Sequence, residues 1–146
     1  MNHVYFSPGE DCKRAIITQL DNAQDSVKVC VFTISDDDIT HAIIQAYRRG
    51  LEVMVITDND KTFDMGSDIY MLYKAGIDVK MDDAPSHMHH KFAIIDDKVL
   101  ITGSFNWTRS ATKYNQENLI VTDSISLVEP YLEQYKELWS KMVSYR

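Results

Sequence analysis

Apolar residues in the first part of the chain follow strand spacing and then helical spacing. Residues 4–6 form a short apolar strand candidate, and Ser7-Pro8-Gly9-Glu10 has the composition of a capping box with proline at the first helical position. The next apolar residues lie four, four and three positions apart, as on one face of a helix. They are Cys12, Ile16, Leu20 and Ala23. This pattern predicts a strand followed by a helix.

A second strand and a second helix have stronger signals. Residues 26–33 (SVKVCVFT) are rich in β-branched side chains and apolar on both faces, which is typical of a strand inside a sheet. Ser35-Asp36-Asp37-Asp38 repeats the capping signal, residues 39–46 have apolar positions at helical spacing, and Gly50 stands where a helix ends. Residues 51–57 (LEVMVIT) predict the third strand.

This β-α-β-α-β order with short connections favours a largely parallel sheet covered by helices. A third helix is expected over residues 67–75, ending at Gly76, before a strand at residues 77–81. From His89 onward the order changes to strands separated by a turn and a loop. These segments are the strand HHKFAIID, the turn Asp96-Asp97, the strand KVLIT, a polar loop from Gly103 to Gln116 and the strand ENLIVT.

The last segment predicts a helix that closes the fold. Residues 127–143 carry apolar side chains on one wide helical face, with Pro130 in the first turn or at a kink. The whole pattern therefore predicts an α/β protein with a mixed, largely parallel central sheet flanked by helices.

The composition is that of one folded domain. The chain has 146 residues, of which 45% are apolar and 25% charged, and this excludes a disordered or low-complexity protein. We expect a single domain over residues 1–146. Cys12 and Cys30 are too few for a disulfide framework and are expected to be buried. Since no long apolar run or signal peptide is present, we expect no membrane span and a cytoplasmic location.

The acidic charge limits how the chain can bind an anion. Acidic residues outnumber basic residues 22 to 15, which gives a formal charge of −7. This excludes nucleic-acid binding by a broadly basic surface. Any anionic substrate must therefore be bound by a local group of donors.

Reactive side chains are densest between residues 89 and 117. Their spacing is HxK, four residues, D, six residues, GSxN, and such a pattern would occur by chance roughly once in a million chains of this length. The candidate catalytic residues are His89, Lys91, Asp96, Ser104, Asn106 and Glu117.

The chemistry of these residues suits a phosphate. His89 and Lys91 are two positions apart on a strand, so that both side chains leave the same face and a neutral imidazole stands beside an ammonium. Ser104 and Asn106 add short neutral donors for phosphate oxygens. Glu117 could accept the other imidazole proton and fix which nitrogen of His89 attacks.

The segment MHHKFAIIDDKVLITGSFNWT, with the later NQEN, resembles the HKD motif of the phospholipase D superfamily. The resemblance implies a phospholipase D-like fold and a reaction without metal or cofactor, in which His89 attacks phosphorus and a second HKD histidine protonates the leaving oxygen. Because the chain has one such motif, the second histidine must come from a second copy, which implies a homodimer. For Asp96, structural support and electrostatic tuning both remain open.

The resemblance extends to the small single-motif members, which are bacterial endonucleases and the mitochondrial cardiolipin hydrolase/Zucchini group. The zinc module and membrane anchor typical of the Zucchini branch have no counterpart in the sequence. We expect a nuclease acting on DNA or RNA. The alternative is a cardiolipin-type phospholipid phosphodiesterase, which a contiguous exposed apolar rim around the pocket would favour. A binding module without turnover is the third possibility.

Several residues near the motif are candidates for substrate contact, beside Lys91, Ser104 and Asn106. They are His87, Trp107, Arg109 and Lys113. Trp107 could stack on a base, but we favour its burial. A metal site is the remaining alternative, and its ligands would come from His87, His89, His90, Asp82 and Asp83. We predict no metal, because Lys91 would repel a cation there.

Overall fold

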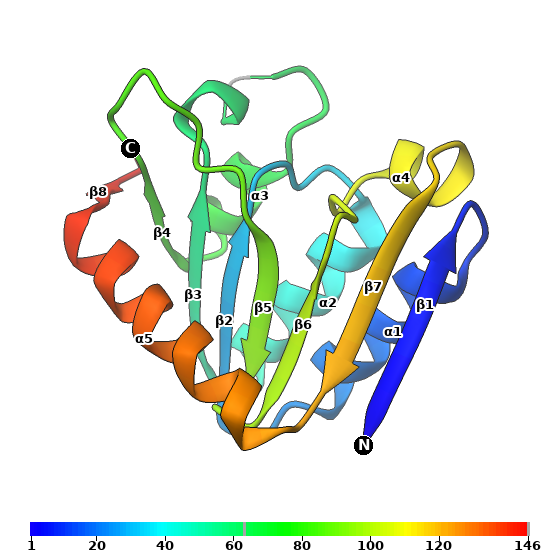
Figure 1. Cartoon of the computed structure of the whole chain (residues 1–146). Coiled ribbons are helices and arrows are strands. Elements are labelled where there is room, and N and C mark those ends of the chain that lie inside the picture. The colour runs from blue at the N-terminus through cyan, green and yellow to red at the C-terminus, as the bar shows by residue number, and fades with distance from the viewer. Residues whose placement is uncertain (63, 146) are drawn as a thin grey trace.

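The computed structural model describes residues 1–62 and 64–145, and in it one eight-stranded sheet separates two layers of helices (Figure 1). The strands are β1 (Asn2–Ser7), β2 (Ser26–Val31), β3 (Glu52–Thr57), β4 (Asp78–Met81), β5 (Lys91–Ile95), β6 (Val99–Gly103), β7 (Glu117–Thr122) and β8 (Val143–Ser144). The helices are α1 (Asp11–Asn22), α2 (Asp37–Arg48), the 3₁₀ turn η1 (Asn59–Lys61), α3 (Ile69–Lys74), α4 (Arg109–Lys113) and α5 (Ile125–Lys141).

The strand order is β1-β7-β6-β5-β2-β3-β4-β8. Among the described residues, β2 with β3 and β3 with β4 pair in parallel, and every other neighbouring pair is antiparallel. The α/β class and the mixed sheet are thus confirmed. The parallel part is smaller than the order of elements in the first half indicates, because β1 pairs at the far edge with β7 and not with β2.

The two faces of the sheet are buried by different helices. One core lies between the sheet and α1, α2 and α3, and a smaller core around Phe92 and Tyr135 lies under α5. All six residues of β2 are buried, as expected for a strand inside a sheet. Cys12 and Cys30 are buried free thiols, as predicted.

The predicted helix starts differ in their outcome. Asp36 caps α2 by accepting the backbone N–H groups of Asp38 and Ile39, so that this capping signal is confirmed. The capping box predicted at Ser7–Glu10 is wrong, because Ser7 ends β1 and its hydroxyl donates to the Asn115 carbonyl at 2.9 Å. The closing helix is confirmed as α5, while α4 and β8 were not predicted.

No helix among the described residues combines the length and the apolar character that a membrane span requires.

Candidate active site

The spacing of the motif brings most of its residues to one edge of the sheet. His89 precedes β5, Ser104 follows β6 and Glu117 begins β7. Since β5, β6 and β7 pair antiparallel, the start of β5, the end of β6 and the start of β7 meet at the same edge. The carboxyl end of β2 joins them, because Val31 is the register partner of Lys91.

His89 and Lys91 form the closest pair of this edge. The Lys91 Nζ lies 2.7 Å from His89 Nδ1 and donates to the His89 carbonyl at 2.9 Å. Burial, then the Lys91 ammonium and His87, lower the pKa of His89, while the Asp58 carboxylate opposes this change. Burial also lowers the pKa of Lys91, and the Glu117 carboxylate opposes that shift. These effects favour the neutral form of the His89 imidazole.

Ser104 and Asn106 are fixed so that donor hydrogens remain for a ligand. The Ser104 hydroxyl oxygen accepts the Asn118 backbone N–H at 3.1 Å, which leaves its own hydrogen to donate. The Asn106 Oδ1 accepts the Thr33 N–H at 3.3 Å, so that its NH₂ group points the other way. Gly103 permits the close approach of β6 to β7, because a β-carbon there would overlap the Asn118 carbonyl.

Glu117 lies near this group but does not take the contact that the sequence indicated. Its carboxylate accepts a hydrogen bond from Asn115 Nδ2 at 3.3 Å. Within the described residues no hydrogen bond joins it to His89, and its electrostatic effect falls on Lys91. The expected orientation of His89 by Glu117 is thus not seen in this chain.

Asp96 lies apart from the other motif residues. It follows the opposite end of β5, where its carboxylate accepts the N–H groups of Gln24, Asp25 and Ser26 at 2.7–3.1 Å. Burial acts against ionisation, but these backbone bonds outweigh it and lower the pKa of Asp96. Of the two roles left open for Asp96, this geometry fits structural support, and the structure does not bring it to the site.

Phe32 is a site residue that sequence reasoning missed. Its ring centroid lies 4.5 Å from that of His89 and 5.4 Å from that of His87. The ammonium groups of Lys61 and Lys91 lie 5.2 Å and 5.4 Å from the same centroid. A signal existed, because Phe32 directly follows a parallel strand, and the carboxyl ends of such strands are where ligands bind.

The other proposed substrate contacts are scattered. Trp107 is 1% exposed, so that its predicted burial is confirmed and little of its surface is left for a substrate contact. Arg109 is paired with Asp37 at 2.6 Å, whereas Lys113 is exposed in the last turn of α4. His87 lines a pocket of about 470 Å³ together with His89 and His90.

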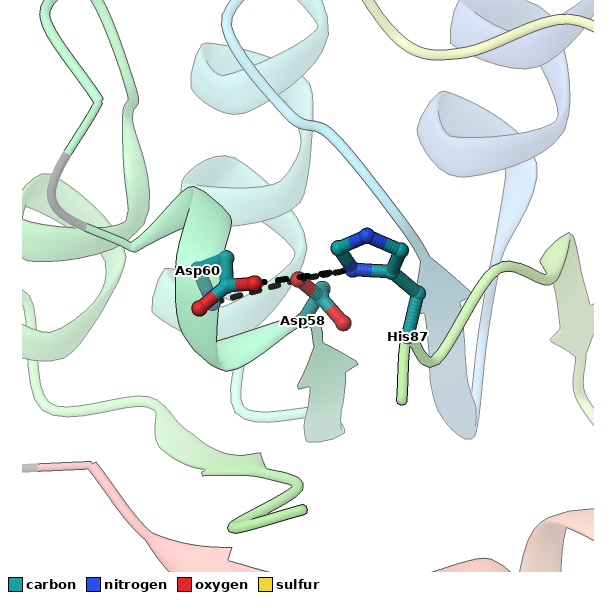
Figure 2. A group of neighbouring side chains, drawn as sticks. All are labelled: Asp58, Asp60 and His87. Carbon is teal, nitrogen blue, oxygen red and sulfur yellow. Dashed lines mark hydrogen bonds and ion pairs between the residues drawn. The ribbon is translucent and has the colours of Figure 1, made fainter. Parts of the chain in front are cut away.

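The metal-site alternative is not assembled as the sequence suggested. The His90 ring turns away to pack against Phe92, with 5.5 Å between centroids. The described residues instead bring one potential ligand atom each of Asp58, Asp60 and His87 within 4.8 Å of one another (Figure 2). Asp58 is fully buried and its two oxygens already accept the N–H groups of Met88 and Asp60. Hydrogen bonding accounts for this group, and we do not identify it as a metal site.

Comparison with known proteins agrees with this arrangement. Residues 16–139 match the family model for "Cardiolipin synthase, PLD-like domain". A mitochondrial cardiolipin hydrolase from Chlamydomonas reinhardtii is 39% identical over 94% of this chain and 61% of its own length, and one from Homo sapiens is 40% identical over 91% and 53%. The chain thus spans about three fifths or less of the length of these curated relatives.

Solved structures match over almost the full length of both chains. The phospholipase D family member Nuc from Salmonella typhimurium has a TM-score of 0.92 at 28% identity and covers 100% of this chain and 98% of its own. NucT from Helicobacter pylori has a TM-score of 0.91 at 27% identity, with 99% of each chain covered. With its fold, its motif and its sequence in agreement, the chain belongs to the phospholipase D superfamily, as the HKD spacing predicted.

Proposed function

We propose that this chain is a phosphodiesterase that acts through a phosphohistidine on His89 and needs no metal ion. The observation that carries the proposal is the contact between His89 and Lys91 at an exposed sheet edge, beside the donors of Ser104 and Asn106. A neutral imidazole has the lone pair that attack on phosphorus requires. The neighbouring donors can balance the charge of the phosphate in place of a cation.

The reaction has two displacement steps. In the first, a ring nitrogen of His89 bonds to phosphorus, the bond to the leaving oxygen breaks, and an acid gives that oxygen a proton. In the second, the conjugate base of that acid takes a proton from water, the water oxygen bonds to phosphorus and the bond to His89 breaks. Lys91 moves from the imidazole to a phosphate oxygen when substrate binds, because the charged oxygen is the better acceptor.

The acid must stand opposite the attacking nitrogen. His87 lies on the same side as His89, since both rings contact Phe32. His90 packs on the other face of the sheet. We therefore assign the acid to His89 of a second copy, which makes the active species a homodimer with one shared site.

An exposed apolar patch supports this assembly. Val4 and Phe6 on β1 and Ile120 on β7 face away from the core that lies under α1, α2 and α3. These three residues are 56%, 66% and 39% exposed. Figure 1 shows α5 running from β7 towards β8, so that it leaves β1 and β7 uncovered on this face. The patch continues to the site, because Phe6 is the register partner of Asn118, which binds Ser104. We propose that a second copy covers this patch.

Phe6→Asp tests the dimer. A charge in a buried apolar interface is expected to convert the protein to monomers and to remove most activity, because each monomer then lacks the acid. Sedimentation and turnover of a model phosphodiester measure the two effects, with the exposed Ile125→Asp on α5 as the matched control. A fully active Phe6→Asp monomer would contradict the shared site.

For the substrate, we propose nucleic acid first. Full-length correspondence with Nuc and NucT supports a compact nuclease, and Lys61, Lys91 and the Phe32 ring together offer cations and a stacking surface. A cardiolipin-type phospholipid is the second candidate, because the relatives with 39–40% identity carry that name. The pocket lining does not decide between them, since it mixes Asp82 and His87 with Leu138 and Met142.

One panel separates these substrates. Wild type and His89→Ala are incubated with single-stranded DNA, duplex DNA, RNA and cardiolipin vesicles, each with and without EDTA. We expect cleavage of a nucleic acid by wild type alone, unaffected by EDTA. Cleavage of cardiolipin alone would favour the second candidate, and activity that EDTA abolishes and a divalent ion restores would overturn the metal-independent mechanism.

A further inference from the structure

A second histidine of the same chain is held beside His89 by a buried carboxylate. The His87 Nδ1 lies 3.3 Å from Asp58 Oδ2 and 3.7 Å from Asp60 Oδ2. Asp58 is fully buried at the end of β3, whereas the His87 side chain is 50% exposed. Figure 2 shows the His87 ring facing both carboxylates. A protonated imidazole at this position would form an ion pair with a buried carboxylate.

This pair acts on the same ring that supports the nucleophile. The rings of His87 and His89 both pack against Phe32, His87 by its edge at 79° between planes. A charge on His87 or on Asp58 therefore acts on His89 over a short distance at a partly buried edge, where screening by solvent is incomplete. The two charges have opposite effects on His89. His87 can therefore influence His89 as well as hold the segment before β5 against Asp58.

We propose that His87 is a positioning residue whose positive charge offsets Asp58 and thereby keeps His89 neutral and nucleophilic at mildly acidic pH. Without that charge, the carboxylates of Asp58 and Asp60 would draw a proton onto His89. The inference rests on the proposed function, since it concerns the nucleophile of that reaction. The two charges act on His89 with the expected signs, because His87 lowers and Asp58 raises the pKa of His89.

Other charged groups near the pair come from η1, β5, β7 and the segment after β4. Lys61 of η1 and Lys91 of β5 lie near Phe32, Asp82 lines the same pocket after β4, and Glu117 acts on Lys91 from β7. A substitution of His87 leaves the residues that carry these charges unchanged. Its substitution therefore isolates one charge.

Two substitutions of His87 separate charge from hydrogen bonding. Glutamine keeps a donor for Asp58 but carries no charge, whereas arginine keeps a positive charge. In His87→Gln we expect the acidic limb of the kcat/KM profile, and the titration of the His89 ring by NMR, to move up by about 0.5–1 pH unit. His87→Arg is expected to leave both near the wild-type position. His41→Gln, on the exposed side of α2, is the matched control.

Asp58→Asn in the His87→Gln background completes the test, since removal of the carboxylate should return the limb towards its wild-type position. Equal profiles for wild type and His87→Gln would overturn the inference, and so would an equal shift in His87→Arg. If His89→Ala remains active, the proposed function fails whatever the titration of His89 shows. The NMR titration needs no turnover, so that the two failures can be told apart.

Discussion

The two ends of β5 carry two parts of one sequence motif, and their surroundings differ. At one end, His89 is exposed and contacts Lys91 and the Phe32 ring. At the other end, Asp96 accepts three backbone N–H groups, two from the loop between α1 and β2 and one from Ser26 at the start of β2. The two side chains are seven positions apart, which corresponds to roughly 20 Å along an extended strand.

This difference shows that a contiguous motif need not be a single site. Burial and a neighbouring cation make His89 harder to protonate, which favours its role as a nucleophile and lowers the stability of the fold at acidic pH. Backbone donors make Asp96 easier to ionise, which stabilises the turn that ends the same strand. We therefore expect substitutions at one end to change activity and substitutions at the other end to change stability.

The largest effect is expected for His89→Ala. Loss of the nucleophile should lower kcat/KM for a model phosphodiester at least about 10³-fold, because His89 is the group that we propose to form the covalent intermediate. The thermal midpoint should stay close to that of wild type, since the side chain is exposed. His90→Ala is the matched control, and a comparable loss there would show that the wrong imidazole has been assigned.

Lys91→Gln is expected to have the next largest effect. Removal of the ammonium takes away a donor to the phosphate, and we expect kcat/KM to fall about 10²-fold or more at pH 7. Removal of Lys91 would move the acidic limb of the pH profile to lower pH only if Lys91 raised the pKa of His89. Because Lys91 lowers it, the limb should move up. A downward shift would contradict the electrostatic account of this edge.

Much of the fold could be predicted because local signals were unambiguous. The apolar run of β2, the Asp36 cap of α2 and the long apolar face of α5 each depend on residues close in sequence. The missed features depend on pairing at a distance. The edge position of β1 follows from its register with β7, and β8 is two residues that pair with β4.

The candidate site could be predicted only in part for the same reason. The spacing of His89, Lys91, Ser104 and Asn106 on antiparallel strands is sufficient to place them at one edge. The Asp58–His87 contact joins residues 29 positions apart, and no periodicity reports it. Glu117 was expected to bind His89, but strand register alone does not say which neighbouring charge a carboxylate contacts.

The smallest effect on activity is expected at the opposite end of β5, for Asp96→Asn. Asparagine keeps one acceptor oxygen and tolerates the left-handed backbone at φ 56°, so that the substitution removes the charge and replaces the second acceptor oxygen by a donor. We expect kcat/KM to stay within a few-fold of wild type, and unfolding in urea at pH 7 to show that the free energy of unfolding falls by about 1–2 kcal/mol.

The pH dependence of this stability difference follows from the pKa of Asp96. The folded-state pKa of Asp96 is lowered, so the contribution of its carboxylate to stability is present above the unfolded pKa and is lost as pH falls through the folded value. The difference in stability between the two proteins should therefore narrow as the pH falls below about 4. A large fall in kcat/KM with unchanged stability would return Asp96 to the catalytic group and remove the contrast between the two ends of the strand.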